Sequence, residues 1–150
     1  MKKISLLILI CISMFLFISC KKKTNYIVGE ERAFIDKIYE YIEKKPKDYC
    51  LVDVRDLNEA YGMGHFRGFI NYDIQNGNTD EFIYKIESMY SKDKTIFIID
   101  EDGSYVETLQ SVLNTRGYKK VIIYLGGYER LKDENKNDFE IVNGIDDCGC

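Results

Sequence analysis

The acidic turn at residues 100–104 holds the side chains in this sequence that are best suited to chemistry. It reads Asp-Glu-Asp-Gly-Ser and follows the apolar segment at residues 95–99. An aspartate at such a place can attack a phosphoryl group, and clustered carboxylates can bind Ca²⁺. The sequence offers no cationic partner or metal motif beside it, and the twelve-residue spacing of a calcium loop is absent. It favours a plainer role, in which Asp102 or Ser104 caps the following helix.

Cysteines are the second set of candidates, and two of the five form a Cys-Gly-Cys tail at Cys148 and Cys150. In an oxidising compartment such a pair can close a strained, redox-labile disulfide. It could also bind a soft metal ion, pair with another chain or be an accidental tail. Cys50, at the head of an apolar run, is expected to be an inert core residue.

The first 19 residues have the composition of a secretory signal. Two lysines precede an uncharged apolar run at residues 4–18, and Cys20 follows at once. The run is shorter than the roughly 20 residues that a membrane-spanning helix needs. Its end, Phe-Ile-Ser-Cys, resembles the lipobox of bacterial lipoproteins, which implies that Cys20 is acylated after cleavage. An ordinary signal peptide or a signal anchor, with Cys20 incidental, is the alternative.

The chain therefore divides into a signal peptide (1–19), a polar tether (20–28), one domain (29–142) and a tail (143–150). Cleavage leaves 19 basic against 25 acidic residues, a net charge of −6. Because no basic footprint for nucleic acid remains, the expected partner is the membrane, through the lipid anchor. The lysines at residues 21–23 would neighbour lipid headgroups or serve as a solvated linker. The expected location is outside the cytoplasm, on the bacterial cell envelope.

Apolar strands alternate with amphipathic helices along the domain. Strands are predicted at residues 50–54, 69–72, 95–99, 121–125 and 139–142. Helices are predicted between residue 29 and Pro46, and at residues 56–61, 80–90 (capped by Thr79 or Asp80), 104–114 and 128–131. This alternation predicts an α/β domain with a mostly parallel central sheet covered by helices on both faces.

Three motifs in this order resemble those of the rhodanese (sulfurtransferase) domain. They are LVDVR from residue 51, GHFRG from residue 64 and YLGGYERL from residue 124. The resemblance covers about residues 26–142 and implies the three-layer rhodanese-like fold. The family's active-site loop reads C-x-x-G-x-R followed by Ser or Thr. Alignment on Gly103 places its nucleophilic cysteine at Asp100 and its arginine at Tyr105.

This replacement is expected to remove sulfur-transfer chemistry from the loop. In the family, backbone N–H groups at the turn and at the start of the next helix stabilise a cysteine thiolate and then its persulfide. The Asp100 carboxylate, already ionised, can accept the same N–H groups and so occupy the nest itself. Glu101 and Asp102 add negative charge, and a like charge 4 Å away costs an approaching anion about 4 kcal/mol.

The remaining motif residues are expected to be structural. By resemblance, His65 holds the geometry of a turn, and Arg55 and Glu59 pair near it. The glycines are expected to serve tight turns or left-handed backbone. The full set is Asp53, Arg55, Glu59, Gly64, His65, Gly68, Gly126 and Gly127.

The sequence thus predicts a membrane-anchored, non-catalytic binding module with no cofactor and no metal. Its loop face, with Asp100 to Tyr105, would meet another protein or a small ligand. The alternative is a sulfurtransferase or thiol redox carrier that works through Cys148 and Cys150. Against it, the acidic loop would raise the pKa of an approaching thiol.

Overall fold

The computed structural model describes residues 26–27, 30–74 and 78–145 of the chain. The predicted signal peptide, Cys20 and the tail cysteines Cys148 and Cys150 lie outside the described residues. Within the described ranges, no helix combines the length and the apolar character needed to cross a membrane.

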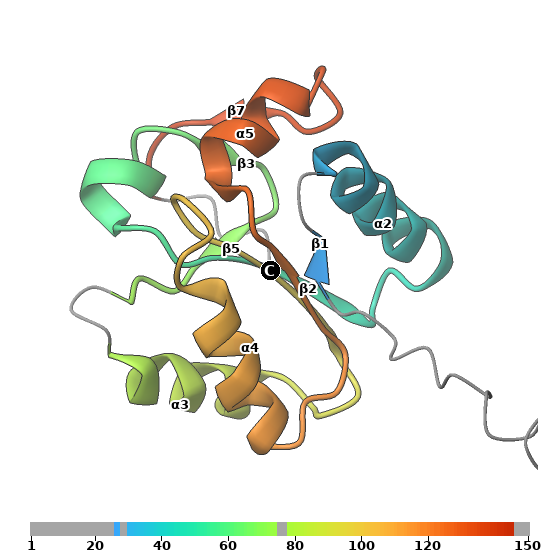
Figure 1. Cartoon of the computed structure of the whole chain (residues 1–150), viewed down its shortest axis with the longest axis vertical. Helices are drawn as coiled ribbons and strands as arrows, with labels where there is room; N and C mark the ends of the chain where they lie inside the picture. The colour runs from blue at the N-terminus through green and yellow to red at the C-terminus, as the bar shows by residue number, and fades with distance from the viewer. Residues whose placement is uncertain (1–25, 28–29, 75–77, 146–150) are drawn as a thin grey trace, which may run out of the picture.

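A parallel sheet forms the centre of the described part of the chain (Figure 1). From one edge to the other its strands are β1 (Tyr26–Ile27), β6 (Val121–Tyr124), β5 (Thr95–Ile99), β2 (Tyr49–Asp53) and β4 (Ile70–Asn71). A separate antiparallel pair joins β3 (His65–Phe66) to β7 (Ile141–Val142). Because the strands are parallel, their carboxyl ends lie at the same end of the sheet. The loops that follow β2, β5 and β6 therefore lie together there.

Helices cover both faces of the sheet. Figure 1 shows α2 (Glu31–Lys44) and α5 (Gly127–Glu134) on one face, and α3 (Thr79–Met89) and α4 (Val106–Thr115) on the other. This is the predicted α/β architecture, a parallel central sheet between two helical layers.

Alternation along the strands divides the core into two clusters, because successive strand residues point to opposite faces. In β5, Phe97 packs edge-on against Phe34 of α2, with ring centroids 5.7 Å apart. The next residue, Ile98, belongs to the cluster that holds Leu109 of α4. All four side chains are fully buried, so each face of the sheet has its own apolar layer.

The helix boundaries agree with the prediction to within two residues, except that α5 continues past Leu131 to Glu134. The first helix ends at Lys44, before Pro46, as expected. The cap of α3 is a correction: Asn78 accepts the N–H of Glu81 at 3.2 Å, whereas Thr79 and Asp80 already lie inside the helix. Asn is as good a capping residue as Asp, so sequence alone does not separate them.

Strands β1 and β7 differ from the prediction, and the short strand β3 was not predicted. Residues 26–27, which the sequence places in the tether, form the edge strand β1 beside β6, with Tyr26 opposite Ile123. The predicted last edge strand at 139–142 shortens to β7 and pairs with β3, not with the main sheet. Both depend on pairing between segments far apart in the chain, which a local pattern does not reveal.

Candidate functional site

The acidic turn lies where the resemblance places the functional site, at the carboxyl end of β5. Asp100 is the first residue after this strand, and Asp53 ends the neighbouring β2. After Asp53, the short helical turn η1 (Leu57–Tyr61) begins behind Asp56, whose carboxylate accepts the N–H groups of Asn58 and Glu59. The loops after β2, β5 and β6 supply the side chains and backbone of the site.

The Asp100 side chain turns back into its own loop. The residue is 5% exposed, and one carboxylate oxygen accepts the N–H of Gly103 at 2.5 Å. The other oxygen accepts the N–H of Tyr105 at 2.8 Å. As predicted, the carboxylate accepts backbone N–H groups of the loop.

Two kinds of environment act on the pKa of Asp100. Burial raises the pKa of its carboxyl above the ordinary aspartate value. The N–H groups of Tyr105 and Gly103 act in the opposite direction, and the charge of Asp102 raises the pKa further. In the exposed Asp102, by contrast, hydrogen bonding to Ser104 lowers the pKa.

The predicted cap of α4 is wrong. Asp102 accepts the N–H of Ser104 at 2.9 Å and stays outside the helix, which begins at Val106. Tyr105 stands at the N-cap without a capping side-chain bond. The Asp100 carboxylate accepts the Tyr105 N–H. The side chain that bonds to the backbone before α4 therefore lies at the end of β5 and not in the turn.

The backbone of the loop is held against the turn after β6. The N–H of Tyr128 is shared by the carbonyl oxygens of Asp100, at 3.0 Å, and Glu101, at 3.1 Å. Gly103 has φ +85°, and a Cβ there would lie 2.1 Å from the carbonyl oxygen of Leu125. Only glycine fits so close an approach in this conformation.

Arg55 is a buried cation beside the loop. It forms an ion pair with Asp53 at 2.8 Å, and both side chains are almost completely buried. Its guanidinium also donates to the carbonyl of Gly64 at 2.8 Å and lies 3.5 Å from the centre of the Tyr128 ring. A more distant contact, 3.8 Å, reaches the exposed Glu101.

The prediction that Arg55 pairs with Glu59 is corrected by the structure. Among the described residues, the ion pairs of Arg55 are those with Asp53 and Glu101. Asp53 lies two residues before Arg55 at the strand end, and its buried carboxylate meets the guanidinium through both oxygens. Such a two-oxygen geometry is the one that guanidinium groups prefer. Glu59 is exposed on η1 instead.

His65 has the structural position that the resemblance implies. Its ring is fully buried and stacks on Tyr61, with centroids 3.7 Å apart. Its Nδ1 lies 3.1 Å from the carbonyl oxygen of Tyr61. It therefore holds the end of η1 to β3.

The structure requires glycine at three of the four motif positions. Gly68 and Gly127 have positive φ, as expected, whereas Gly64 and Gly126 do not. At Gly126 the reason is space, because a Cβ would lie 1.9 Å from the Tyr124 hydroxyl oxygen. At Gly64 a Cβ would make only ordinary contacts of 3.6 Å.

A cavity of about 230 Å³ opens beside the loop. The residues that line it include Arg55, Glu59, Met63, Glu101, Tyr128 and Lys132. It therefore mixes cationic, anionic and aromatic groups. Tyr128 and Lys132 were not predicted as site residues, since their approach to Arg55 and Glu101 depends on chain segments that meet only in the fold.

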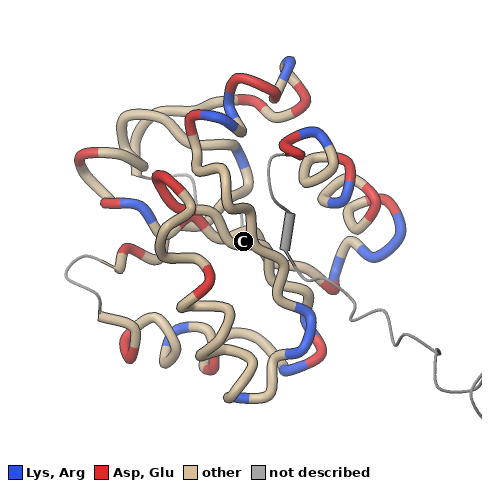
Figure 2. Tube along the Cα trace, in the orientation of Figure 1, with Lys and Arg blue, Asp and Glu red and all other residues tan. Residues whose placement is uncertain are grey.

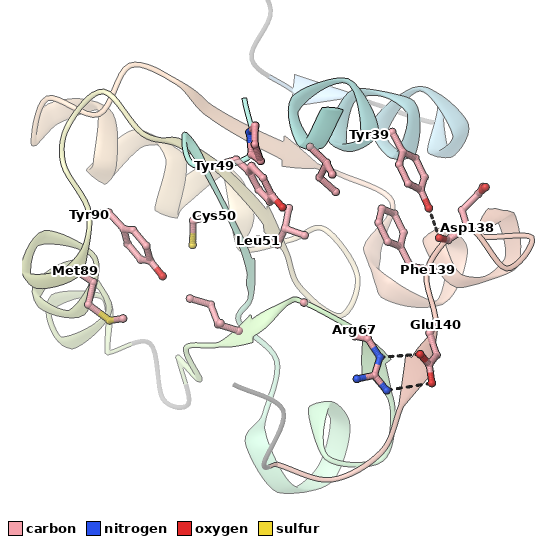
Figure 3. A pocket seen from close by; sticks show the side chains of 14 residues that line it. Tyr39, Tyr49, Cys50, Leu51, Arg67, Met89, Tyr90, Asp138, Phe139 and Glu140 are labelled. Atoms are coloured by element: carbon pink, nitrogen blue, oxygen red, sulfur yellow. Dashed lines mark hydrogen bonds and ion pairs between the residues drawn. The ribbon is translucent and has the colours of Figure 1, made fainter. Parts of the chain in front are cut away.

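A larger cavity, of about 580 Å³, lies elsewhere, near the start of β2 (Figure 3). Cys50 lines it at 6% exposure, next to Tyr90, and Tyr39, Phe139 and Arg67 form another part of its wall. Burial, followed by the neighbouring Cys50, raises the pKa of the Tyr90 hydroxyl. Cys50 belongs to the apolar core as expected, and it lies near the start of β2, at the opposite end of the sheet from the loop at Asp100.

Within the described ranges, no three His, Cys, Asp or Glu side chains converge as metal ligands would. At the acidic turn, Asp100 and Asp102 both direct carboxylate oxygens to backbone N–H groups. Both carboxylates therefore stabilise the turn through hydrogen bonds.

Comparison with known sequences supports the resemblance. A family model of the rhodanese-like domain matches residues 35–134. The tRNA uridine(34) hydroxylase of Corynebacterium diphtheriae is 27% identical over 106 residues. The match takes in 69% of this chain but only 33% of that relative, so the chain spans about a third of the relative's length.

Solved structures agree on the fold. The Alr3790 protein from Anabaena sp. has a TM-score of 0.60 at 18% identity, over 75% of this chain and 80% of that one. The thiosulfate sulfurtransferase from Pseudomonas aeruginosa also has a TM-score of 0.60, at 14% identity, over 81% of this chain and 20% of that one.

The single-domain sulfurtransferase RDL2 of Saccharomyces cerevisiae has a TM-score of 0.55 at 18% identity, over 80% of this chain and 98% of that one. At such identities the structures show the fold alone, whereas the family match covers more than half of the chain. The chain therefore belongs to the rhodanese-like domain family.

Proposed function

We propose that this chain is a membrane-anchored rhodanese-like domain in which Asp100 replaces the nucleophilic cysteine, and that it acts as a binding module without sulfur-transfer activity. One observation carries the proposal: the Asp100 carboxylate accepts the N–H groups of Gly103 and Tyr105. These donors would otherwise stabilise a thiolate or persulfide. A carboxylate in their place has no sulfur to carry.

The surroundings of Asp100 support the same conclusion. The exposed carboxylates of Glu101 and Asp102 flank the turn and repel anionic sulfur donors. Tyr105, at the place of the family's arginine, directs its hydroxyl to Thr79 at 3.2 Å and supplies no positive charge. A donor such as thiosulfate would therefore meet repulsion where a sulfurtransferase needs attraction.

The loop face also carries exposed apolar side chains that suit a protein partner. Met63 is 73% exposed, Ile145 53% and Ile141 40%. Ile141 and Ile145 lie beside the turn formed by Gly62 and Gly64. Apolar groups gathered next to a polar rim are typical of interaction sites.

Transfer of sulfane sulfur from thiosulfate to cyanide tests the non-catalytic role. The wild type is expected to give no thiocyanate above the buffer rate, whereas Asp100→Cys should acquire weak turnover because the N–H groups remain. Adding Glu101→Gln and Tyr105→Arg should raise that turnover by removing repulsion and supplying a cation. Turnover by the wild type would contradict the proposal.

The tail cysteines remain a second candidate, for a specific reason. The Gly144 N–H donates to the carbonyl of Gly62 at 2.9 Å, which places the end of the described chain on the loop face. Cys148 follows Ile145 by three residues, an extended reach of about 10 Å. Wild-type turnover that disappears in Cys148→Ser and Cys150→Ser would establish this alternative.

The anchor has an independent test. Cells that express the full chain are labelled with a fatty-acid analogue, and label is expected on the wild type and absent from Cys20→Ser. An unlabelled wild type, or equal labelling of the variant, would overturn the lipid anchor.

A further inference from the structure

Basic side chains gather at the amino ends of the central strands. They come from three loops, at residues 43–48 before β2, 91–95 before β5 and 116–120 before β6. Together these loops hold eight basic and three acidic residues, a net charge of +5 in a chain whose net charge is −4. We call these three loops the basic edge.

Hydrogen bonds between the loops show that they form one surface. The Lys94 ammonium donates to the carbonyl of Lys47, and the Lys120 ammonium donates to the carbonyl of Asp93 at 2.8 Å. Most of the basic side chains are exposed, and Figure 2 shows them on neighbouring loops at one end of the sheet. Lys44 and Lys92 form exposed ion pairs with carboxylates of α2 and α3, and such pairs are weak.

The opposite edge carries the opposite charge. The loops at residues 54–61, 72–74, 100–105 and 125–129 hold seven acidic residues and one basic residue, a net charge of −6. The lone cation there, Arg55, is buried in its pair with Asp53. The domain is thus polarised along its strands, from the basic edge to the acidic loop at Asp100.

The N-terminal attachment lies at the basic edge. β1 runs parallel to β6, so the chain enters the sheet at the same end as the loop that holds Lys119 and Lys120. Cys20 precedes Tyr26 by six residues, which span at most about 20 Å. An anchor at the N-terminus would therefore hold the basic edge near the membrane.

We propose that the basic edge is a membrane-docking surface that binds anionic lipid headgroups and points the Asp100 loop away from the bilayer. The proposal rests on the proposed anchor for proximity alone. Juxtamembrane lysines and arginines are attracted to anionic lipids within a Debye length of the surface. The acidic edge is repelled by the same surface, so both ends of the domain favour one orientation.

Tryptophan quenching tests this orientation, because the chain has no tryptophan of its own. Thr115→Trp places a single reporter at the basic edge, and Met63→Trp places one on the loop face; both positions are exposed. The full chain is reconstituted in brominated phosphatidylcholine vesicles with or without about a third of phosphatidylglycerol. With phosphatidylglycerol, Thr115→Trp emission should fall about twofold more than Met63→Trp emission.

Matched charge variants identify the residues responsible. Lys45→Gln, Lys47→Gln and Lys119→Gln, combined in one chain, should abolish the difference between the two reporters. The control removes the same charge away from the edge, at Lys37, Lys132 and Lys136 on and after α2 and α5, and should keep it. High salt should erase the difference in the wild-type background.

Equal quenching of the two reporters in phosphatidylglycerol vesicles, or stronger quenching of Met63→Trp, would overturn the proposal. Salt-dependent binding of single-stranded DNA without any response to phosphatidylglycerol would do the same. A failure of the lipid anchor can be told apart from a failure of the docking surface. The first appears as absence of fatty-acid label on Cys20. The second appears as equal quenching at two positions of chains that share the same N-terminal segment.

Discussion

At the scale of single residues, Asp100 combines two opposing environments. Its carboxylate gains the N–H groups of Gly103 and Tyr105, yet burial disfavours its charge, and the net effect is a raised pKa. A group whose pKa is raised in the folded state binds protons more tightly there than in the unfolded chain. Its stabilising effect is therefore complete below the unfolded pKa and is lost as the pH rises through the folded pKa.

Asp100→Asn is expected to remove this pH dependence, because the amide does not titrate. Relative to the variant, the wild type should lose free energy of unfolding as the pH rises above about 4. Urea unfolding of both chains from about pH 3 to about pH 7 measures it. Asp102→Asn should show the opposite sign, because the pKa of Asp102 is lowered in the fold. A difference between wild type and Asp100→Asn that grows with pH in the wild type's favour would contradict this account.

Arg55 should matter more for stability than an exposed arginine. Arg55→Met leaves the buried Asp53 carboxylate without its partner and is expected to cost about 3–5 kcal/mol in the free energy of unfolding. The exposed pair of Arg67 and Glu140 is the control, and Arg67→Met should cost less than about 1 kcal/mol. In urea titrations, the double variant Asp53→Asn, Arg55→Met should lose less free energy of unfolding than the two single variants lose together. Additive costs would mean that the pair is not coupled.

At the scale of elements, the Asp100 loop is positioned by backbone contact with the turn after β6. Gly103 and Gly68 have nearly the same φ, +85° and +88°. A Cβ at Gly103 would clash with the carbonyl of Leu125. At Gly68, no described atom outside the two neighbouring residues lies within 4 Å of such a Cβ. The two glycines therefore separate the cost of the left-handed conformation from the cost of the clash.

Gly68→Ala is expected to cost about 1–2 kcal/mol, the strain of left-handed backbone alone. Gly103→Ala should cost at least about 2 kcal/mol more, because the loop must leave Leu125. Thermal or urea unfolding measures both, and hydrogen exchange of the Tyr105 N–H should accelerate only in Gly103→Ala. Equal costs would show that the loop does not depend on this close approach.

The elements that could be predicted from sequence are those whose own residues decide their structure. The apolar stripe of α2 and the buried run of β5 fix their type and their limits. The start of α4 was placed two residues early because Asp100, and not Asp102 or Ser104, accepts the N–H of Tyr105, the residue before the helix. The two-residue strands β1 and β7 exist only through their partners.

The candidate site shows the same division. The place of Asp100 and its bonds to the loop could be predicted, because loop and residue are adjacent in sequence. The partner of Arg55 could not, since Asp53 and Glu59 both lie within reach along the chain. What decides is that Asp53 is buried at the end of β2, and that Arg55 lies against the ring of Tyr128, which comes from the other end of the domain.

At the scale of the whole molecule, charge is separated along the strand direction. The loops at the carboxyl ends of the strands carry a net charge of −6, and the basic edge carries +5. A field of this kind acts over distances comparable to the Debye length, about 10 Å at moderate salt. It therefore influences any charged reagent that approaches the Asp100 loop, not only those in contact with it.

A thiol placed at the loop would report this field. In Asp100→Cys, alkylation of the introduced thiol by anionic iodoacetate should be about tenfold slower than by neutral iodoacetamide, after correction for their rates with a free thiol. Mass spectrometry of the peptide that contains residue 100 separates it from the native cysteines. Adding Glu101→Gln and Asp102→Asn, or raising the salt concentration, should bring the ratio towards that of the free thiol. Neutralising Glu134 and Glu140, which lie away from the loop, should leave the ratio almost unchanged. A ratio that ignores both salt and the loop carboxylates would mean that the acidic edge does not repel anions, and the electrostatic part of the case against sulfur transfer would fail.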